Sequence, residues 1–213
     1  MRFIDREDAG RQLAEALHKY RDSEAVVYAL PRGGVPLGFE IAQALNAPLD
    51  LVITRKIGHP MNPEYAVCAI TEEGEMLCNE AEKVSLNTHW LKEAAKKEQD
   101  EVSRRRHAYL SDIKHIPATD KIAIVVDDGI ATGLTIRVAV QSIKKENPKK
   151  LVVAVPAAPY DAIEALREDA DEIIVLEDAR DYLGAVGAYY DNFPQVPDGE
   201  VIDLLEKAPH SSK

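Results

Sequence analysis

Short, continuous runs of apolar residues alternate along the chain with segments of helical periodicity, and this alternation constrains the fold more than any other feature. A strand that is apolar at every position is buried on both faces, as in parallel sheets covered by helices on both sides. Helical segments between the runs supply the crossovers that parallel strands require. The sequence therefore predicts an α/β fold with a parallel sheet at its core. The predicted strands are residues 25–30, 49–54, 122–126, 151–155 and 173–176.

The long segment between the second and third predicted strands holds additional structure. Residues 55–64 contain two prolines, a glycine and an asparagine, which predicts a loop. Residues 65–71 and 75–78 flank Glu72-Glu73-Gly74, an arrangement typical of a hairpin. Residues 87–111 are polar with a thin apolar stripe, which predicts a long, largely exposed helix.

The C-terminal part of the chain is irregular and aromatic. It carries Tyr182, Tyr189, Tyr190 and Phe193, and a last helix is expected near residues 198–206. We therefore expect a core over residues 1–176 and a small hood lobe with a tail over residues 177–213.

The formal net charge of −11 limits the classes of partner. Nucleic-acid binding depends on Lys and Arg that neutralise phosphates, so no nucleic-acid partner is expected. The N-terminus is charged from Arg2 onward, and no apolar run approaches the roughly 20 residues that span a bilayer, so we expect no membrane partner and a cytoplasmic location. Cys68 and Cys78 fit neither a CxxC pair nor zinc spacing. We expect two separate, small side chains, buried or half buried, in a reducing environment.

The segment IVVDDGIATGLT (residues 124–135) combines a buried strand, two acids and a loop of small residues that opens a helix. Ligands of open α/β sheets bind at the carboxyl ends of the strands, where Asp127 and Asp128 stand. Adjacent carboxylates suit vicinal hydroxyls or the water shell of a metal. The N–H groups of the loop, with the hydroxyls of Thr132 and Thr135, converge at a helix N-terminus and can bind an anion. A ribose 5-phosphate carries this same pairing of a diol and a monophosphate.

Other interpretations of the segment account for less of it. No Lys follows the glycine as in a Walker A loop, and the pattern is not GxGxxG. The alternative without a ligand is an acidic turn that caps a helix through Thr132.

The segment closely resembles the motif that binds 5-phosphoribosyl-1-pyrophosphate (PRPP) in type I phosphoribosyltransferases: about four apolar residues, two acids, small residues, Thr-Gly and a terminal Thr or Ser. The resemblance implies a Rossmann-like core, a hood lobe and a mobile lid. It also implies that Asp127 and Asp128 hold the ribose 2- and 3-hydroxyls. The 5-phosphate would be held by Ala131, Thr132, Gly133, Leu134 and Thr135.

Two more segments resemble parts of that family. Arg32-Gly33-Gly34, within LPRGGVPLG, is similar to the pyrophosphate loop, where small residues let backbone N–H groups approach the ligand. Arg55-Lys56 resembles the pair that opens the mobile loop in adenine- and orotate-type members. The alternative for these cations is a solvated surface. With the tail AVGAYYDNF, the resemblance covers residues 1–207 and extends to a bacterial and archaeal group of phosphoribosyltransferases whose acceptor is unassigned.

The resemblance implies a magnesium-dependent reaction in which a nitrogenous base displaces pyrophosphate from the ribose anomeric carbon. Asp127 and Asp128 would reach Mg²⁺ through water, and Arg55 and Lys56 would stabilise the leaving group. The lid would span about residues 57–79 and exclude water. A homodimer is also implied.

The acceptor base is constrained only in part. Hypoxanthine-guanine enzymes carry a basic Asp where this chain has Ala131, as adenine- and orotate-type members do, so a 6-oxopurine that relies on that Asp is disfavoured. Tyr189, Tyr190 and Phe193 could stack on a flat base. The alternative is that these three side chains are core residues of the hood.

Two other functions remain compatible with the sequence: a non-catalytic sensor of PRPP, and an unrelated α/β protein that binds a nucleotide or sugar phosphate. Three consecutive basic residues, Arg104, Arg105 and Arg106, point in three directions on a helix, which favours a solvated face over a role in the lid or at an interface. A lone loop histidine such as His59 is more often without function than in contact with a ligand.

Overall fold

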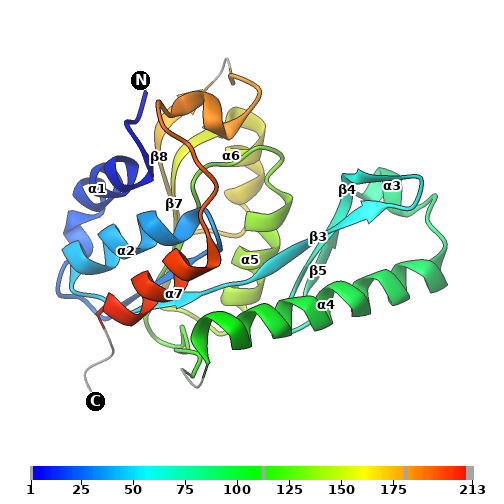
Figure 1. Ribbon diagram of the computed structural model, residues 1–213, viewed down its shortest axis with the longest axis horizontal. Helices are drawn as coiled ribbons and strands as arrows, with labels where there is room; N and C mark the ends of the chain where they lie inside the picture. The colour runs from blue at the N-terminus through cyan, green and yellow to red at the C-terminus, as the bar shows by residue number, and fades with distance from the viewer. Residues whose placement is uncertain (1, 112–113, 180–181, 210–213) are drawn as a thin grey trace.

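A five-stranded parallel sheet forms the centre of the molecule, as predicted. The computed structural model describes residues 2–111, 114–179 and 182–209 (Figure 1). The sheet has the order β2-β1-β6-β7-β8, and every neighbouring pair is parallel. Its strands are β1 (Ala25–Ala29), β2 (Leu49–Leu51), β6 (Ile122–Val126), β7 (Lys150–Pro159) and β8 (Glu172–Ala179).

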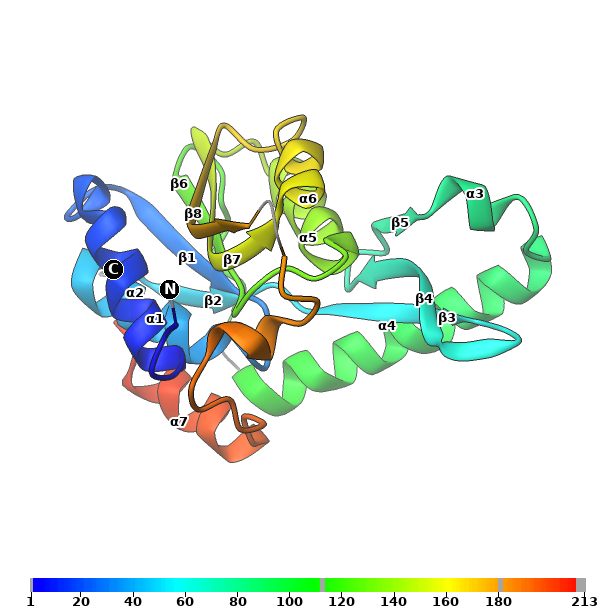
Figure 2. The ribbon, with the colours of Figure 1, turned by 90° about the horizontal axis from the view of Figure 1, so that it is seen from above.

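Helices cover both faces of this sheet, so each strand sends alternate side chains into two separate cores. One face packs against α1 (Arg6–Ala16) and α2 (Gly34–Leu45), and the C-terminal α7 (Asp198–Lys207) packs on α2. The other face packs against α5 (Leu134–Lys144) and α6 (Tyr160–Leu166), and Figure 2 shows the two groups on opposite sides. Short 3₁₀ turns follow α1 at His18–Tyr20 (η1) and precede α7 at Val186–Tyr189 (η2).

The segment between β2 and β6 builds an arm, residues 54–110, that projects away from the sheet (Figures 1 and 2). Its antiparallel sheet has the order β3-β4-β5, and its small apolar core includes Ile57, Val67 and Leu91. The predicted long helix, α4, lies along this sheet. The elements are β3 (Thr54–His59), β4 (Asn62–Thr71), β5 (Met76–Cys78), α3 (Glu80–Lys83) and α4 (Thr88–Leu110).

The prediction of a loop over residues 55–64 is wrong, because most of that segment is strand. β3 pairs with β4, and the register between them shifts around Gly58. A Cβ at Gly58 would lie 2.1 Å from the carbonyl oxygen of Pro63, so the glycine permits the strands to approach closely at this irregularity. Glycine and proline here mark a bulge and a tight turn inside a hairpin. The hairpin predicted over residues 65–78 is confirmed as β4–β5.

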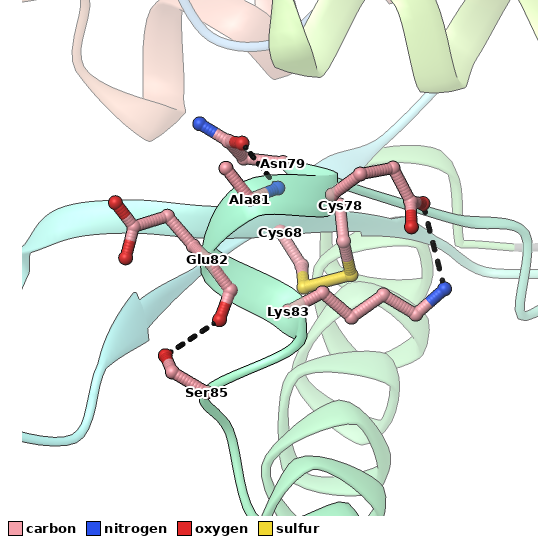
Figure 3. Close-up of a disulfide and its surroundings, with 8 residues drawn as sticks. Cys68, Cys78, Asn79, Ala81, Glu82, Lys83 and Ser85 are labelled. Carbon is pink, nitrogen blue, oxygen red and sulfur yellow. Dashed lines mark hydrogen bonds and ion pairs between the residues drawn. A yellow bond between two sulfur atoms is a disulfide. The ribbon is translucent and has the colours of Figure 1, made fainter.

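The two cysteines form a disulfide between neighbouring strands, so the expectation of two separate thiols is also wrong (Figure 3). Cys68 on β4 stands directly opposite Cys78 on β5 in the strand register. The absence of a CxxC pair was a poor guide, because a hairpin can bring distant cysteines opposite one another.

A buried carboxylate joins the base of the arm to the core. Asp50, on β2, is 1% exposed and accepts hydrogen bonds from Arg106 of α4 (3.1 Å) and from the backbone N–H of Ile116 (2.8 Å). The two ring nitrogens of His115 lie 2.8 Å from carboxylate oxygens of Asp50 and Glu146, on opposite sides of the ring. These hydrogen bonds, led by the one to Asp50, raise the pKa of His115 to about 9. A doubly protonated imidazole donates to both acids.

Within the described ranges, no helix combines the length and the apolar character needed to cross a bilayer.

The position of His115 predicts a pH-dependent stability. Its pKa in the folded state lies above the ordinary value of about 6.5, so its contribution is complete below that pH and disappears as the pH rises through about 9. We expect His115→Gln to lower the free energy of unfolding at pH 6 by roughly 1 kcal/mol, reduced for partial solvent exposure. Denaturant unfolding at pH 6 and pH 10 measures this. His89→Gln, at an exposed helix position, is the control, and an equal loss at both pH values would contradict the assignment.

Candidate active site

The two acids predicted as ribose ligands stand where β6 ends, at the carboxyl edge of the sheet. The Oδ1 atom of Asp127 accepts a hydrogen bond from the backbone N–H of Asp128 (2.8 Å), which fixes the turn. Asp127 faces a cavity, whereas the carboxylate of Asp128 is turned toward α1. The two side chains therefore have different environments although they are adjacent in sequence.

The cavity has a volume of about 440 Å³ and lies between the edge of the core sheet and the arm. It brings together four of the predicted site residues: Asp127, Thr135, Arg55 and Lys56. The remaining walls come from the segment after β1, from the arm strands and from α4. These lining residues are Leu30, Pro31, Thr54, Gly58, Pro63, Ala66 and Arg105.

The glycines of the predicted pyrophosphate loop pack against the acids. A Cβ at Gly33 would lie 2.0 Å from Oδ2 of Asp128, and one at Gly34 would lie 2.7 Å from the carbonyl oxygen of Val126. Side chains at these positions would push the loop away from the end of β6. Arg32 does not line the cavity. Its Nη1 atom lies 3.6 Å from Asp198 at the start of α7.

The predicted phosphate loop opens α5. Gly133, the residue before the helix, has φ +79°, a left-handed conformation that glycine adopts without strain. Ala131 and Thr132 are exposed, Leu134 is the first helical residue, and no side chain of the described residues caps the helix. The N–H groups of the first turn therefore remain available to an anion.

Arg6 is a site residue that the sequence did not indicate. Its Nε and Nη2 atoms each lie 2.9 Å from Oδ2 of Asp128, and its guanidinium lies 3.7 Å from the ring centroid of Phe193. Nη1 also donates to the carbonyl oxygen of Pro194. No local pattern could reveal this contact, because it joins α1 to residues far along the chain.

The protonation of the two acids follows from these surroundings. Burial raises the pKa of Asp127 well above its usual value, and the adjacent charge of Asp128 raises it further. Burial also raises the pKa of Asp128, but the guanidinium of Arg6 opposes that rise. The charge of Asp128 is therefore compensated by a direct ion pair with Arg6, whereas the charge of Asp127 is favoured only by the weaker attraction of Lys56.

The aromatic residues predicted to stack on a base are placed in the hood, away from the cavity lining. Tyr189 and Tyr190 are each 3% exposed. Tyr190 stacks on Phe193, with 4.7 Å between ring centroids, and its hydroxyl donates to the carbonyl oxygen of Asp128 (2.6 Å). In this arrangement the rings brace the acidic turn. His59 lies in an adjoining groove beside α4, which shares Arg55 and Lys56 with the cavity.

The donor set suits a metal that is shared with a ligand. Among the described residues, no group of three or more His, Cys, Asp or Glu side chains is arranged to hold an ion. Asp127 nevertheless presents a carboxylate to the cavity. Mg²⁺ commonly binds one or two carboxylates, waters and substrate phosphates, and this chemistry fits Asp127 with a phosphorylated ligand.

Comparison with known proteins agrees with this geometry. The sequence model of the family described as "Phosphoribosyl transferase domain" matches residues 4–192. Two curated proteins of Mycobacterium tuberculosis, "Putative phosphoribosyl transferase MT0597" and "Putative phosphoribosyl transferase Rv0571c", are each 40% identical over 208 residues, which is 97% of this chain. The match covers 47% of each relative, so the chain spans about half their length.

A solved structure extends the comparison to the fold. The crystal structure of TT1426 from Thermus thermophilus has a TM-score of 0.81 and 38% sequence identity, over 96% of this chain and 98% of that one. The family match over most of the sequence shows that this chain belongs to the phosphoribosyl transferase domain family.

Proposed function

We propose that this protein binds PRPP with Mg²⁺ and transfers the 5-phosphoribosyl group to a nitrogenous base, releasing pyrophosphate. The observation that carries the proposal is the cavity, in which Asp127 and the first turn of α5 share one space with Arg55 and Lys56. A ligand with a diol, a monophosphate and a pyrophosphate matches that set of acidic, anion-binding and cationic groups.

Each part of PRPP has a counterpart in the site. Asp127 would accept hydrogen bonds from the ribose hydroxyls, and Asp128 would do so through Oδ1, the oxygen that Arg6 does not contact. Residues 131–135 would hold the 5-phosphate. Arg55 and Lys56 would bind the pyrophosphate together with the N–H groups of Gly33 and Gly34. Arg32 would join them only after leaving Asp198.

In the reaction, the bond from the anomeric carbon to the pyrophosphate oxygen breaks, a bond to a nitrogen of the base forms, and the proton of the base is released to solvent or to the leaving pyrophosphate. Positive charge develops on the ribose and negative charge on the leaving group, as in glycoside chemistry. Arg55 and Lys56 stabilise the leaving pyrophosphate, and Mg²⁺, when bound, neutralises part of its charge. The arm provides one wall of the cavity and shields the reacting carbon from water.

The acceptor remains open in this proposal. Ala131 has no carboxylate that could act as a base toward a purine. This favours an acceptor whose reaction does not require a carboxylate at that position. A stacking role for Phe193 requires Arg6 to leave the face of its ring. The homodimer expected from the resemblance and the cytoplasmic location expected from the sequence stay predictions.

The proposal predicts saturable PRPP binding that depends on the two acids. We expect calorimetric titration with excess Mg²⁺ to show binding by the wild type and none by Asp127→Asn/Asp128→Asn. The charge-matched control is Asp203→Asn/Glu206→Gln, two exposed positions on α7, and it should bind normally. No binding by the folded wild type contradicts the proposal. Binding without pyrophosphate release across a panel of nucleobases would instead identify a PRPP sensor.

The buried acid should also cost stability in the absence of ligand. The pKa of Asp127 is raised in the folded state, so the folded protein loses stability as the pH rises above the ordinary carboxyl value. Asn retains the Oδ1 acceptor for the N–H of Asp128 but carries no charge. We therefore expect Asp127→Asn to raise the free energy of unfolding at pH 7 by on the order of 1 kcal/mol while it abolishes PRPP binding. Denaturant unfolding at pH 7 measures this change. A lower free energy of unfolding for the variant than for the wild type would show that the charge of Asp127 does not destabilise the fold.

Arg6 should set the pH range of ligand binding. Without its guanidinium the pKa of Asp128 rises further, so the carboxylate is lost at a higher pH. We expect the pH below which PRPP affinity falls to move up by about one unit in Arg6→Gln and to stay near the wild-type value in Arg6→Lys. Titrations between pH 5 and pH 9 test this, and an affinity loss that is equal at every pH would assign Arg6 a purely structural role.

A further inference from the structure

The three consecutive arginines of α4 point in different directions, and their environments differ accordingly. Arg104 is exposed and binds Glu101. Arg106 is mostly buried and binds Asp50 at the base of the arm. Arg105 is half buried and lines the cavity with Arg55, Lys56 and Asp127. The expectation of a solvated basic face therefore holds only for Arg104.

We propose that Arg105 is a further diphosphate-binding residue of this site and acts beside Arg55 and Lys56. The inference rests on the proposed function, because it assigns the cation to the pyrophosphate end of PRPP. It adds a residue that lies outside the three motif segments and that belongs to the arm.

The charge balance of the cavity supports this role. A pyrophosphate group carries several negative charges, and the chain as a whole has a net charge of −11, so the local site must supply the positive charge. Arg32 is turned toward Asp198, and Arg55 forms an ion pair with Glu98 at 2.8 Å. Arg105 brings a planar guanidinium to the same cavity, and such a group can donate two parallel hydrogen bonds to phosphate oxygens.

The contacts of Glu101 allow Arg105 to change partners. Arg105 Nε donates to Oε1 of Glu101 (2.9 Å), while Arg104 donates to both oxygens of the same carboxylate, at 2.7 and 2.9 Å. When Arg105 turns to an anionic ligand, Glu101 keeps a bidentate partner. The exchange therefore leaves no unpaired carboxylate behind, which lowers the cost of recruiting Arg105.

The diphosphate that Arg105 binds could be part of PRPP or free pyrophosphate. The affinities for three ligands distinguish these two cases. Calorimetric titrations with excess Mg²⁺ would use PRPP, inorganic pyrophosphate and ribose 5-phosphate. The variants are Arg105→Gln and, as matched control, Arg167→Gln, which removes an exposed arginine that pairs with a glutamate, Glu164, outside the cavity. We expect Arg105→Gln to weaken PRPP and pyrophosphate roughly tenfold or more and to leave ribose 5-phosphate within about twofold. Arg167→Gln should leave all three unchanged, and Arg105→Lys should recover part of the loss.

Several outcomes would overturn the proposal. Equal affinities of Arg105→Gln and Arg167→Gln for pyrophosphate exclude a role for Arg105. An equal loss for all three ligands, ribose 5-phosphate included, shows general damage to the site. If the wild type binds pyrophosphate but not PRPP, the proposed function fails. The titrations with pyrophosphate still test whether Arg105 binds a diphosphate. If the wild type binds neither ligand, both proposals fail.

Discussion

The ion pair between Arg6 and Asp128 is the contact on which the rest of the site depends. Two adjacent carboxylates in a buried turn repel each other, and a nearby cation favours the charged form of the one it contacts. Arg6 supplies that cation, and Phe193 and Pro194 hold Arg6 in place. Tyr190 connects the two ends of this set of contacts, because it stacks on Phe193 and its hydroxyl donates a hydrogen bond to the carbonyl oxygen of Asp128. The first helix, the central strand and the hood thus stabilise one another through a single acid.

The cavity itself has two walls from different parts of the chain. The core contributes the acids and the first turn of α5, whereas the arm contributes Arg55, Lys56 and Arg105. The position of one wall relative to the other is set at the base of the arm. There, Arg106 joins Asp50 of the core to Glu72 of the arm, and Lys145 on the segment after α5 pairs with Glu75. A ligand that bridges the walls depends on these remote contacts as well as on the residues it touches.

The central sheet and the acidic turn could be predicted because their signals are local. A strand buried on both faces is apolar throughout, and the residues that follow it lie at the edge where ligands bind. Arg6 and Arg105 could not be predicted in this way, because their partners or their cavity come from distant segments. The β3 strand was missed because Gly58 and Pro63 serve an irregular pairing that has the composition of a loop. The cysteine pairing could have been predicted from the sequence, since a hairpin that turns at residues 72–74 places Cys68 opposite Cys78.

That disulfide has a mechanical consequence for the arm. It fastens β4 to β5 at the end of their pairing that lies away from the turn, so these strands cannot slide past each other or separate there. The shift in register lies in the other pair, β3–β4, around Gly58, and Gly58, Pro63 and Ala66 of that pair line the cavity. β4 is therefore held in one register on its β5 side, and the irregular pairing that borders the cavity is confined to its β3 side.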